Sequence, residues 1–171
     1  MTALLIALDR QPYLWVAIIC FALLVAALIF GIQKTLIPPS WRYPWQVLTG
    51  GLLLAAILYQ WFLLFDRLSP GGAPQKSRSR YANHRWVGSF SFLLFALHAV
   101  SIGHMLTNIL ALLFLACGLS GVLNREIIRY RKKWMYQLWF GAHIALSAIM
   151  APLIIAHIWI ALAYEGFSFH A

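Results

Sequence analysis

Five long runs of apolar residues follow one another along the 171-residue chain, separated by short polar or proline-containing stretches. The runs are continuous and do not alternate with polar residues, which favours helices over strands. As helices they are long enough to cross the hydrocarbon core of a bilayer, which is about 30 Å thick. The predicted spans are 12–32, 44–65, 84–102, 106–123 and 134–164. The pattern therefore predicts an all-α integral membrane protein, a bundle of five transmembrane helices.

The stretches between the runs contain residues that favour turns. Pro38, Pro39 and Pro44 are expected to break the chain between the first two spans. The other predicted connections are a polar loop over 69–80, a tight turn over 101–103 and a basic segment over 124–133. No connection is long enough to fold alone, so we expect a single transmembrane domain over residues 1–171.

Composition and charge strengthen the membrane prediction. Hydrophobic residues make up 63% of the chain and charged residues only 10%, whereas about a quarter of the residues in soluble domains are charged. The net charge is +9, and the basic residues lie between the apolar runs. We therefore expect the lipid bilayer as the partner of these charges, and no nucleic acid. The expected location is a bacterial inner membrane, which the chain crosses several times.

The distribution of basic residues predicts the orientation. All of the 13 Lys and Arg residues except Lys34 and Arg42 lie on the side of the N-terminus in the five-span arrangement. Because basic loops stay on the cytoplasmic side, the N-terminus is expected in the cytoplasm and the C-terminus outside.

Two of the predicted spans each carry two histidines. His84 and His98 lie fourteen positions apart on the third span, and His143 and His157 have the same separation on the fifth. Fourteen helical steps leave both side chains within about 40° of one face and separate them by about 21 Å. The two spans are predicted to be parallel, so His84 can meet His143 near the inner surface and His98 can meet His157 near the outer surface.

Facing imidazoles from two helices are typical axial ligands of haem iron. The four histidines therefore predict two haem b groups with bis-histidine ligation, one in each leaflet, within a core over 81–164. Gly88 and Gly141 are small enough to leave room for a flat macrocycle between helices. Arg80 and Arg85 lie near the inner pair and are candidates to bind haem propionates. The alternative for both arginines is a place at the membrane interface only.

Other interpretations of the histidines fit less well. A zinc or copper ion is the alternative metal, but ligands about 21 Å apart on one helix cannot share an ion. His84 lies at the start of its predicted span. The inner pair therefore requires either that the third helix extend back into residues 78–83 or that the fifth helix protrude into the cytoplasm. The outer pair, His98 with His157, has no such requirement. Cys20 and Cys117 are expected to be packing residues.

At these residues the chain resembles the ferric-reductase-like transmembrane domain family. That family includes metalloreductases, NADPH oxidases and the membrane subunit of the methionine sulfoxide repair system. The resemblance rests on the two His-x13-His pairs, on HRWVG at 84–88 and on GLSGVLNR at 118–125, and it covers about 81–164. It implies two haems b on the four histidines. The flavin and nicotinamide domains of full-length reductases are missing from this sequence, so we expect another subunit or a quinone as the electron donor.

The expected function is that of a dihaem b-type cytochrome that carries electrons across the membrane. It is expected to work as the electron-transfer subunit of an oxidoreductase, with a protein redox partner in a larger membrane complex or with the quinone pool. One alternative is a small self-sufficient oxidoreductase acting between quinone and superoxide or a metal. The other is a structural subunit without haem.

Overall fold

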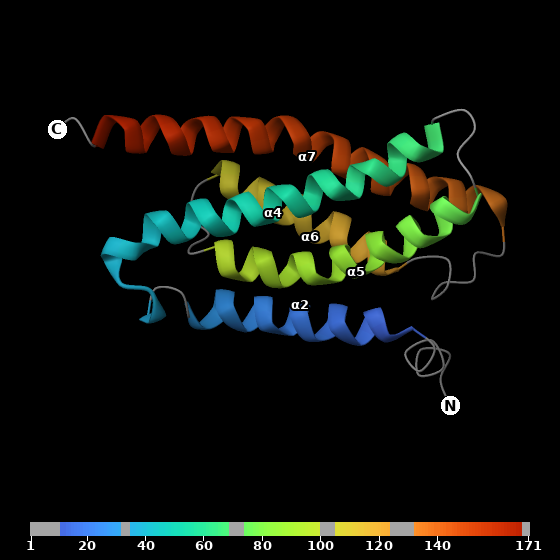
Figure 1. The fold of residues 1–171 in the computed structure, drawn as a ribbon, viewed down its shortest axis with the longest axis horizontal. Coiled ribbons are helices and arrows are strands. Elements are labelled where there is room, and N and C mark those ends of the chain that lie inside the picture. The colour runs from blue at the N-terminus through green and yellow to red at the C-terminus, as the bar shows by residue number, and fades with distance from the viewer. Residues whose placement is uncertain (1–10, 32–34, 69–73, 100–104, 124–131, 169–171) are drawn as a thin grey trace. The chain divides into compact units, whose positions relative to one another are not determined.

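All residues placed in the computed structural model belong to helices or to their ends. The structure describes residues 11–31, 35–68, 74–99, 105–123 and 132–168, with side chains over the same ranges except 63–68, 74–78 and 164–168. The long helices are α2 (Pro12–Phe30), α4 (Pro39–Leu68), α5 (Pro74–His98), α6 (Met105–Val122) and α7 (Lys133–Ser168) (Figure 1). They form two compact units, Met1–Ser101 and Ile102–Ala171.

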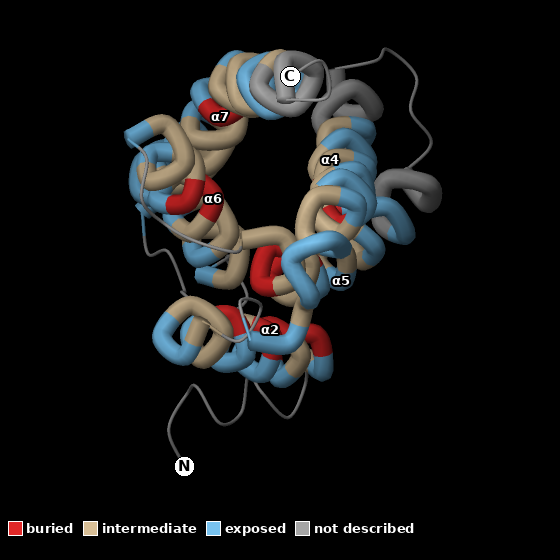
Figure 2. The backbone as a smooth tube through the Cα atoms, turned by 90° about the vertical axis from the view of Figure 1, so that its left-hand side faces the viewer, coloured by how far each residue is buried: buried red, intermediate tan, exposed pale blue. Residues whose placement is uncertain are grey.

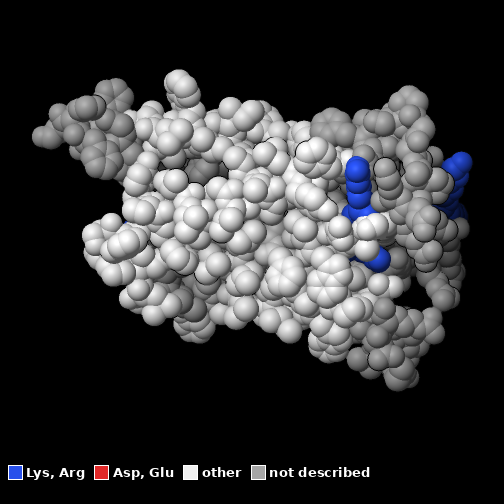
Figure 3. All heavy atoms as spheres, in the orientation of Figure 1, with Lys and Arg blue, Asp and Glu red and all other residues white. Residues whose placement is uncertain are grey.

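Four of these helices are long and apolar enough to cross a membrane. They are α2, α6, the Pro39–Phe62 part of α4 and the Lys133–Ala163 part of α7. Many of their large apolar side chains are exposed, as expected for helices that contact lipid. The face shown in Figure 3 consists mostly of uncharged side chains, with the described Lys and Arg atoms in a few isolated places. The chain therefore has the features of a multi-pass membrane protein.

Helix α5 begins earlier than the sequence predicts. The polar segment 69–80 is predicted to be a loop, and this prediction is wrong for residues 74–80, which are helical. Proline is favoured at the first position of a helix because its φ angle is already helical and its missing N–H is not needed there. Pro74 occupies that position, so ten helical residues, about 15 Å of helix, precede His84. Of the two alternatives for the inner histidine pair, the extension of the third helix is present, and the pairing itself stays a prediction.

Helix α4 also begins earlier than predicted. Pro44 is expected to end the break between the first two spans, but it lies inside α4, which begins at Pro39. A proline in the second turn removes only one hydrogen bond of the helix, and here α4 continues through it. The end of α2 follows a familiar pattern: Gly31 has a φ of +58° and its N–H bonds to the Ala27 carbonyl.

In the first unit, α5 packs against both α2 and α4 (Figures 1 and 2). Helices α2 and α5 run parallel, since contacts advance along both from Tyr13 with Ser89 to Phe21 with Phe92. The buried Ser89 hydroxyl, 3.1 Å from the Tyr13 carbonyl oxygen, links the two backbones. In Figure 2 buried segments of α2 lie on the side that faces α5.

Helices α4 and α5 are antiparallel. The Trp45 indole N–H donates to the Leu97 carbonyl near one end of the pair, at 2.9 Å. Near the other end, the Asn83 amide donates to the Tyr59 hydroxyl at 3.3 Å. These two contacts fix the register in which α5 presents its histidines to α4.

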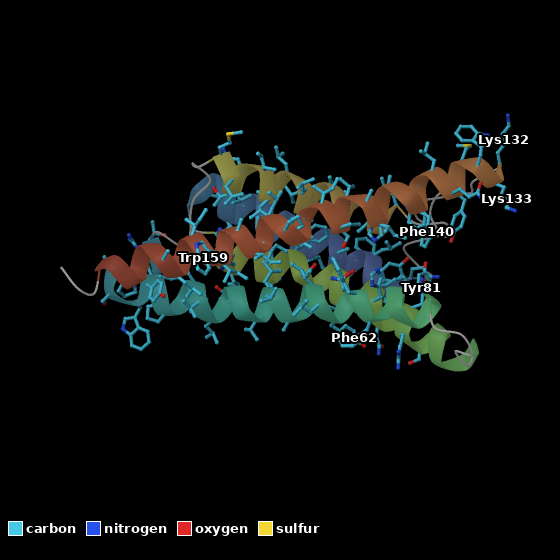
Figure 4. The ribbon with its side chains drawn as sticks, turned by 90° about the horizontal axis from the view of Figure 1, so that it is seen from above. Phe62, Tyr81, Lys132, Lys133, Phe140 and Trp159 are labelled. Atoms are coloured by element: carbon cyan, nitrogen blue, oxygen red, sulfur yellow. The ribbon has the colours of Figure 1, made fainter. Side chains whose placement is uncertain are left out.

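In the second unit, α6 and α7 form an antiparallel helical hairpin. Helix α7 continues through Pro152, which lies between His143 and His157. Lys132 and Lys133 lie where α7 begins, and Trp159 lies toward the other end of the helix (Figure 4). A basic start followed by a long apolar helix is the arrangement expected of a span that enters the membrane after a charged loop.

Candidate functional site

Each predicted histidine pair lies on one continuous helix. His84 and His98 are both on α5, and His143 and His157 are both on α7. All four side chains are half-buried. The spacing of about 21 Å that each helix imposes therefore holds within both units. The pairings of His84 with His143 and of His98 with His157 join residues of different units and remain predictions.

The ring of His98 is held by α4. Its Nδ1 atom lies 3.1 Å from the backbone carbonyl oxygen of Gln46. A carbonyl oxygen can only accept, so Nδ1 carries the proton and donates it. In the neutral ring the lone pair is then on Nε2, the nitrogen that binds a metal in this tautomer.

The ring of His143 is held in the same way by α6. Its Nδ1 atom lies 2.8 Å from the hydroxyl oxygen of Ser120. That hydroxyl donates its single proton to the Cys117 carbonyl at 2.7 Å, so it accepts the proton of Nδ1. The lone pair of neutral His143 is again on Nε2. One histidine in each unit thus has the tautomer that metal-ligating histidines adopt when a neighbouring oxygen fixes the other nitrogen.

A tryptophan strengthens the helix contact beside each of these histidines. The Trp139 indole donates to the carbonyl of Ser120 at 2.8 Å, and Trp45 donates to Leu97, the residue before His98. The two acceptors, the carbonyls of Ser120 and Leu97, lie in the last turns of their helices, where carbonyl groups have no hydrogen-bond donor within the helix. The Trp139 ring also stacks on the His143 ring, with centroids 6.0 Å apart and planes at 11°.

His84 has different surroundings. It lines a pocket of about 210 Å³ together with Tyr59, Phe62 and Arg80. Arg80 and His84 are four positions apart on α5 and so lie on the same side of the helix. The pocket therefore brings a predicted metal ligand and a predicted propionate-binding residue together.

The other predicted cofactor-binding residues have varied environments. The Arg85 guanidinium lies over two aromatic rings, 4.6 Å from the Tyr13 centroid and 4.7 Å from the Tyr81 centroid. The contact with Tyr13 joins α5 to α2, whereas Tyr81 lies on α5 itself, one turn before Arg85. A Cβ added at Gly88 would lie 3.4 Å from the side-chain oxygen of Gln60, whereas one added at Gly141 would meet no atom within 4 Å. The propionate and macrocycle roles of these residues remain predictions.

Over the residues that the structure describes, no group of three or more His, Cys, Asp or Glu side chains is placed to hold a metal ion. Both cysteines, Cys20 and Cys117, are free thiols. A haem iron needs only two protein ligands, so the absence of groups of three or more ligands from the described residues does not test the haem sites, which stay a prediction.

Several residues of this site are not found by reasoning from the sequence. Gln46, Gly50, Ser120 and Trp139 all contact a histidine or its anchoring group. Of these residues only Gly50 gives a signal in the sequence. A glycine inside an apolar helix costs about 1 kcal/mol relative to alanine, so it indicates that another group packs closely against the backbone there. Ser120 and Trp139 give no such signal, because their roles depend on the register between α6 and α7.

Comparison with known proteins gives no relative for this chain. No model of a protein family matches it, and neither a curated protein nor a solved structure does.

Proposed function

We propose that this chain is a dihaem b-type membrane cytochrome that carries electrons across the membrane, working with a protein redox partner or with the quinone pool. The observation that carries the proposal is the pair of histidine-bearing helices. On each helix the two histidines lie about 21 Å apart. One histidine of each helix, His98 on α5 and His143 on α7, donates its Nδ1–H to an oxygen of a neighbouring helix. His84, His98, His143 and His157 are the proposed axial ligands.

The anchored tautomers suit this role. A ligating histidine needs its lone pair on the coordinating nitrogen and a partner for the other nitrogen, which fixes the plane of the ring. His98 and His143 meet both needs through Gln46 and Ser120. Haem, when bound, supplies a one-electron ferric–ferrous couple, while the chain sets its ligands, orientation and potential. In the proposed pairing each haem has one of these anchored ligands.

The proposed topology has five crossings and a cytoplasmic N-terminus, in a bacterial inner membrane. It rests on the basic residues, which lie almost entirely on one side of a five-span arrangement. In this topology α5 also crosses the membrane, although its first half is polar. Its 25 residues extend about 38 Å, and α2 and α4 pack on it, with the polar side chains of Ser89 and Ser91 buried.

The proposed family is the ferric-reductase-like group of membrane haem proteins. The two fourteen-residue histidine intervals support it, together with the HRWVG and GLSGVLNR segments. In this proposal the histidine helices form the haem-binding core, and the electron donor is a separate protein or a quinone.

The test is a reduced-minus-oxidised spectrum of the purified full chain, together with its haem-to-protein ratio. A b-type α-band with two haems per chain is expected. His98→Ala and His84→Ala should each lose half of the haem, whereas His104→Ala, which removes an imidazole outside the four, should retain all of it. Absence of the α-band would contradict the proposal. Full retention of haem by His84→Ala would show that His84 and His143 do not form the inner haem site. Turnover of the purified chain with quinone and superoxide would instead indicate a self-sufficient oxidoreductase.

A further inference from the structure

The hydroxyl of Ser120 lies between a histidine ring and a helix carbonyl. Its oxygen is 2.8 Å from Nδ1 of His143 and 2.7 Å from the carbonyl oxygen of Cys117. A serine hydroxyl has one proton, and the Cys117 carbonyl can only accept. The protons therefore run in one direction, from His143 Nδ1–H to Ser120 and from the Ser120 O–H to Cys117.

The rest of the α6–α7 contact holds the ring in this place. Trp139 stacks on one side of the imidazole and bonds to the Ser120 carbonyl, so the same serine is bound at both its backbone and its side chain. A Cβ added at Gly121 would lie 3.2 Å from Cε1 of His143, closer than most such contacts. The absence of a side chain at Gly121 thus lets the ring approach α6 closely enough to reach Ser120.

From this geometry we propose that Ser120 is a positioning residue for His143 that tunes the haem which His143 helps to hold. The inference rests on the proposed function. Accepting the Nδ1 proton fixes the tautomer with the lone pair on Nε2 and makes the imidazole a stronger donor. A stronger donor favours ferric over ferrous iron, so Ser120 lowers the reduction potential of that one-electron couple. The Nδ1 proton stays on His143 throughout.

The test compares three variants of the full chain in detergent. Ser120→Ala removes the acceptor, Ser120→Thr keeps a hydroxyl, and Ser91→Ala is the matched control. Ser91 also donates to a carbonyl three residues earlier at 2.7 Å, that of Gly88, but on α5. The readouts are haem affinity and the midpoint potentials from a redox titration followed at the α-band, neither of which depends on turnover.

Ser120→Ala is expected to weaken haem binding at one of two sites by about 10- to 100-fold and to raise one of the two midpoint potentials. Ser120→Thr should restore both values, and Ser91→Ala should leave both unchanged. If Ser120→Ala does not insert, Ser120→Cys keeps the side-chain volume with a weaker acceptor, and it should raise the same potential. Wild-type affinity and potentials in Ser120→Ala and Ser120→Cys would overturn the positioning role alone. A wild-type chain without an α-band would overturn the proposed function, and this inference with it.

Discussion

The imidazole of His98 lies directly against the backbone of Gly50. A Cβ added at Gly50 would come within 2.8 Å of Cε1 and 3.1 Å of Nδ1. In a helix the Cβ atom of a residue points back over the preceding turn, so a glycine here leaves the Gln46 carbonyl, four residues earlier, open to a second donor. His98 uses that opening, with Nδ1 at 3.1 Å from the Gln46 oxygen.

Gly50→Ala should therefore displace the His98 ring and break its hydrogen bond to Gln46. Alanine alone favours the helix by about 1 kcal/mol, so a loss cannot come from helix propensity. We expect the variant to lose up to half of the haem, measured as the haem-to-protein ratio of the purified chain. The control is Gly51→Ala, where an added Cβ meets no atom within 4 Å. Equal haem content in the two variants would show that the close approach of His98 to Gly50 is irrelevant to binding.

The contact between His98 and Gly50 shows what can and cannot be predicted from the sequence. The apolar runs predict all five helices, and the histidine spacing predicts which positions share a face, because both depend only on helical geometry. The approach of His98 to Gly50 depends on the register between two helices, which no local pattern specifies. Helix α5 begins at Pro74 and α4 at Pro39, earlier than the sequence pattern predicts. The pattern places these prolines in connections between helices, whereas the first turn of a helix also tolerates proline.

Trp139→Phe is predicted to loosen the α6–α7 hairpin while keeping an aromatic ring against His143. The change removes the indole N–H that bonds to the Ser120 carbonyl at 2.8 Å, and it also makes the ring smaller. Hydrogen bonds between membrane helices contribute about 0.6 kcal/mol on average, so the free energy of unfolding in mixed micelles should fall by at least that amount.

The matched control for this change is Trp159→Phe on the same helix. Trp159 is 75% exposed, so its replacement should leave the unfolding curve unchanged. Equal stability of the two variants would mean that the indole bond of Trp139 contributes nothing to the hairpin.

Ser89→Ala is predicted to weaken the packing of α2 on α5. The Ser89 hydroxyl is buried, and its one proton is shared between the Arg85 carbonyl of α5 at 2.9 Å and the Tyr13 carbonyl of α2 at 3.1 Å. Its loss should lower the unfolding free energy by about 0.6 to 1.7 kcal/mol, the average and the maximum measured for hydrogen bonds between membrane helices. Ser91→Ala serves for comparison, because it removes an equally buried hydroxyl whose bond to Gly88 lies within α5. A larger loss of stability from Ser91→Ala than from Ser89→Ala would contradict the role given to the interhelical bond.

The number of crossings decides on which side of the membrane α7 begins. If α5 crosses, the helices α2, α4, α5 and α6 separate Gln11 from Lys133, and an even number of crossings leaves both residues on one side. If only the four more apolar helices cross, three crossings separate the two residues and they lie on opposite sides. Single cysteines at Gln11 and Lys133, with Cys20 and Cys117 replaced by alanine, distinguish the two cases with a membrane-impermeant maleimide.

We expect neither cysteine to react in intact cells and both to react once the membrane is opened, since five crossings put the basic start of α7 in the cytoplasm with the N-terminus. A cysteine at Thr35, beyond the end of α2, should react from outside and so controls for access of the reagent. Labelling at Lys133 from outside would show that α5 does not cross. The parallel direction of α5 and α7 would then be lost, and with it the pairing of His84 with His143 and of His98 with His157. The crossing of α5 is thus the condition on which both proposed haem sites depend.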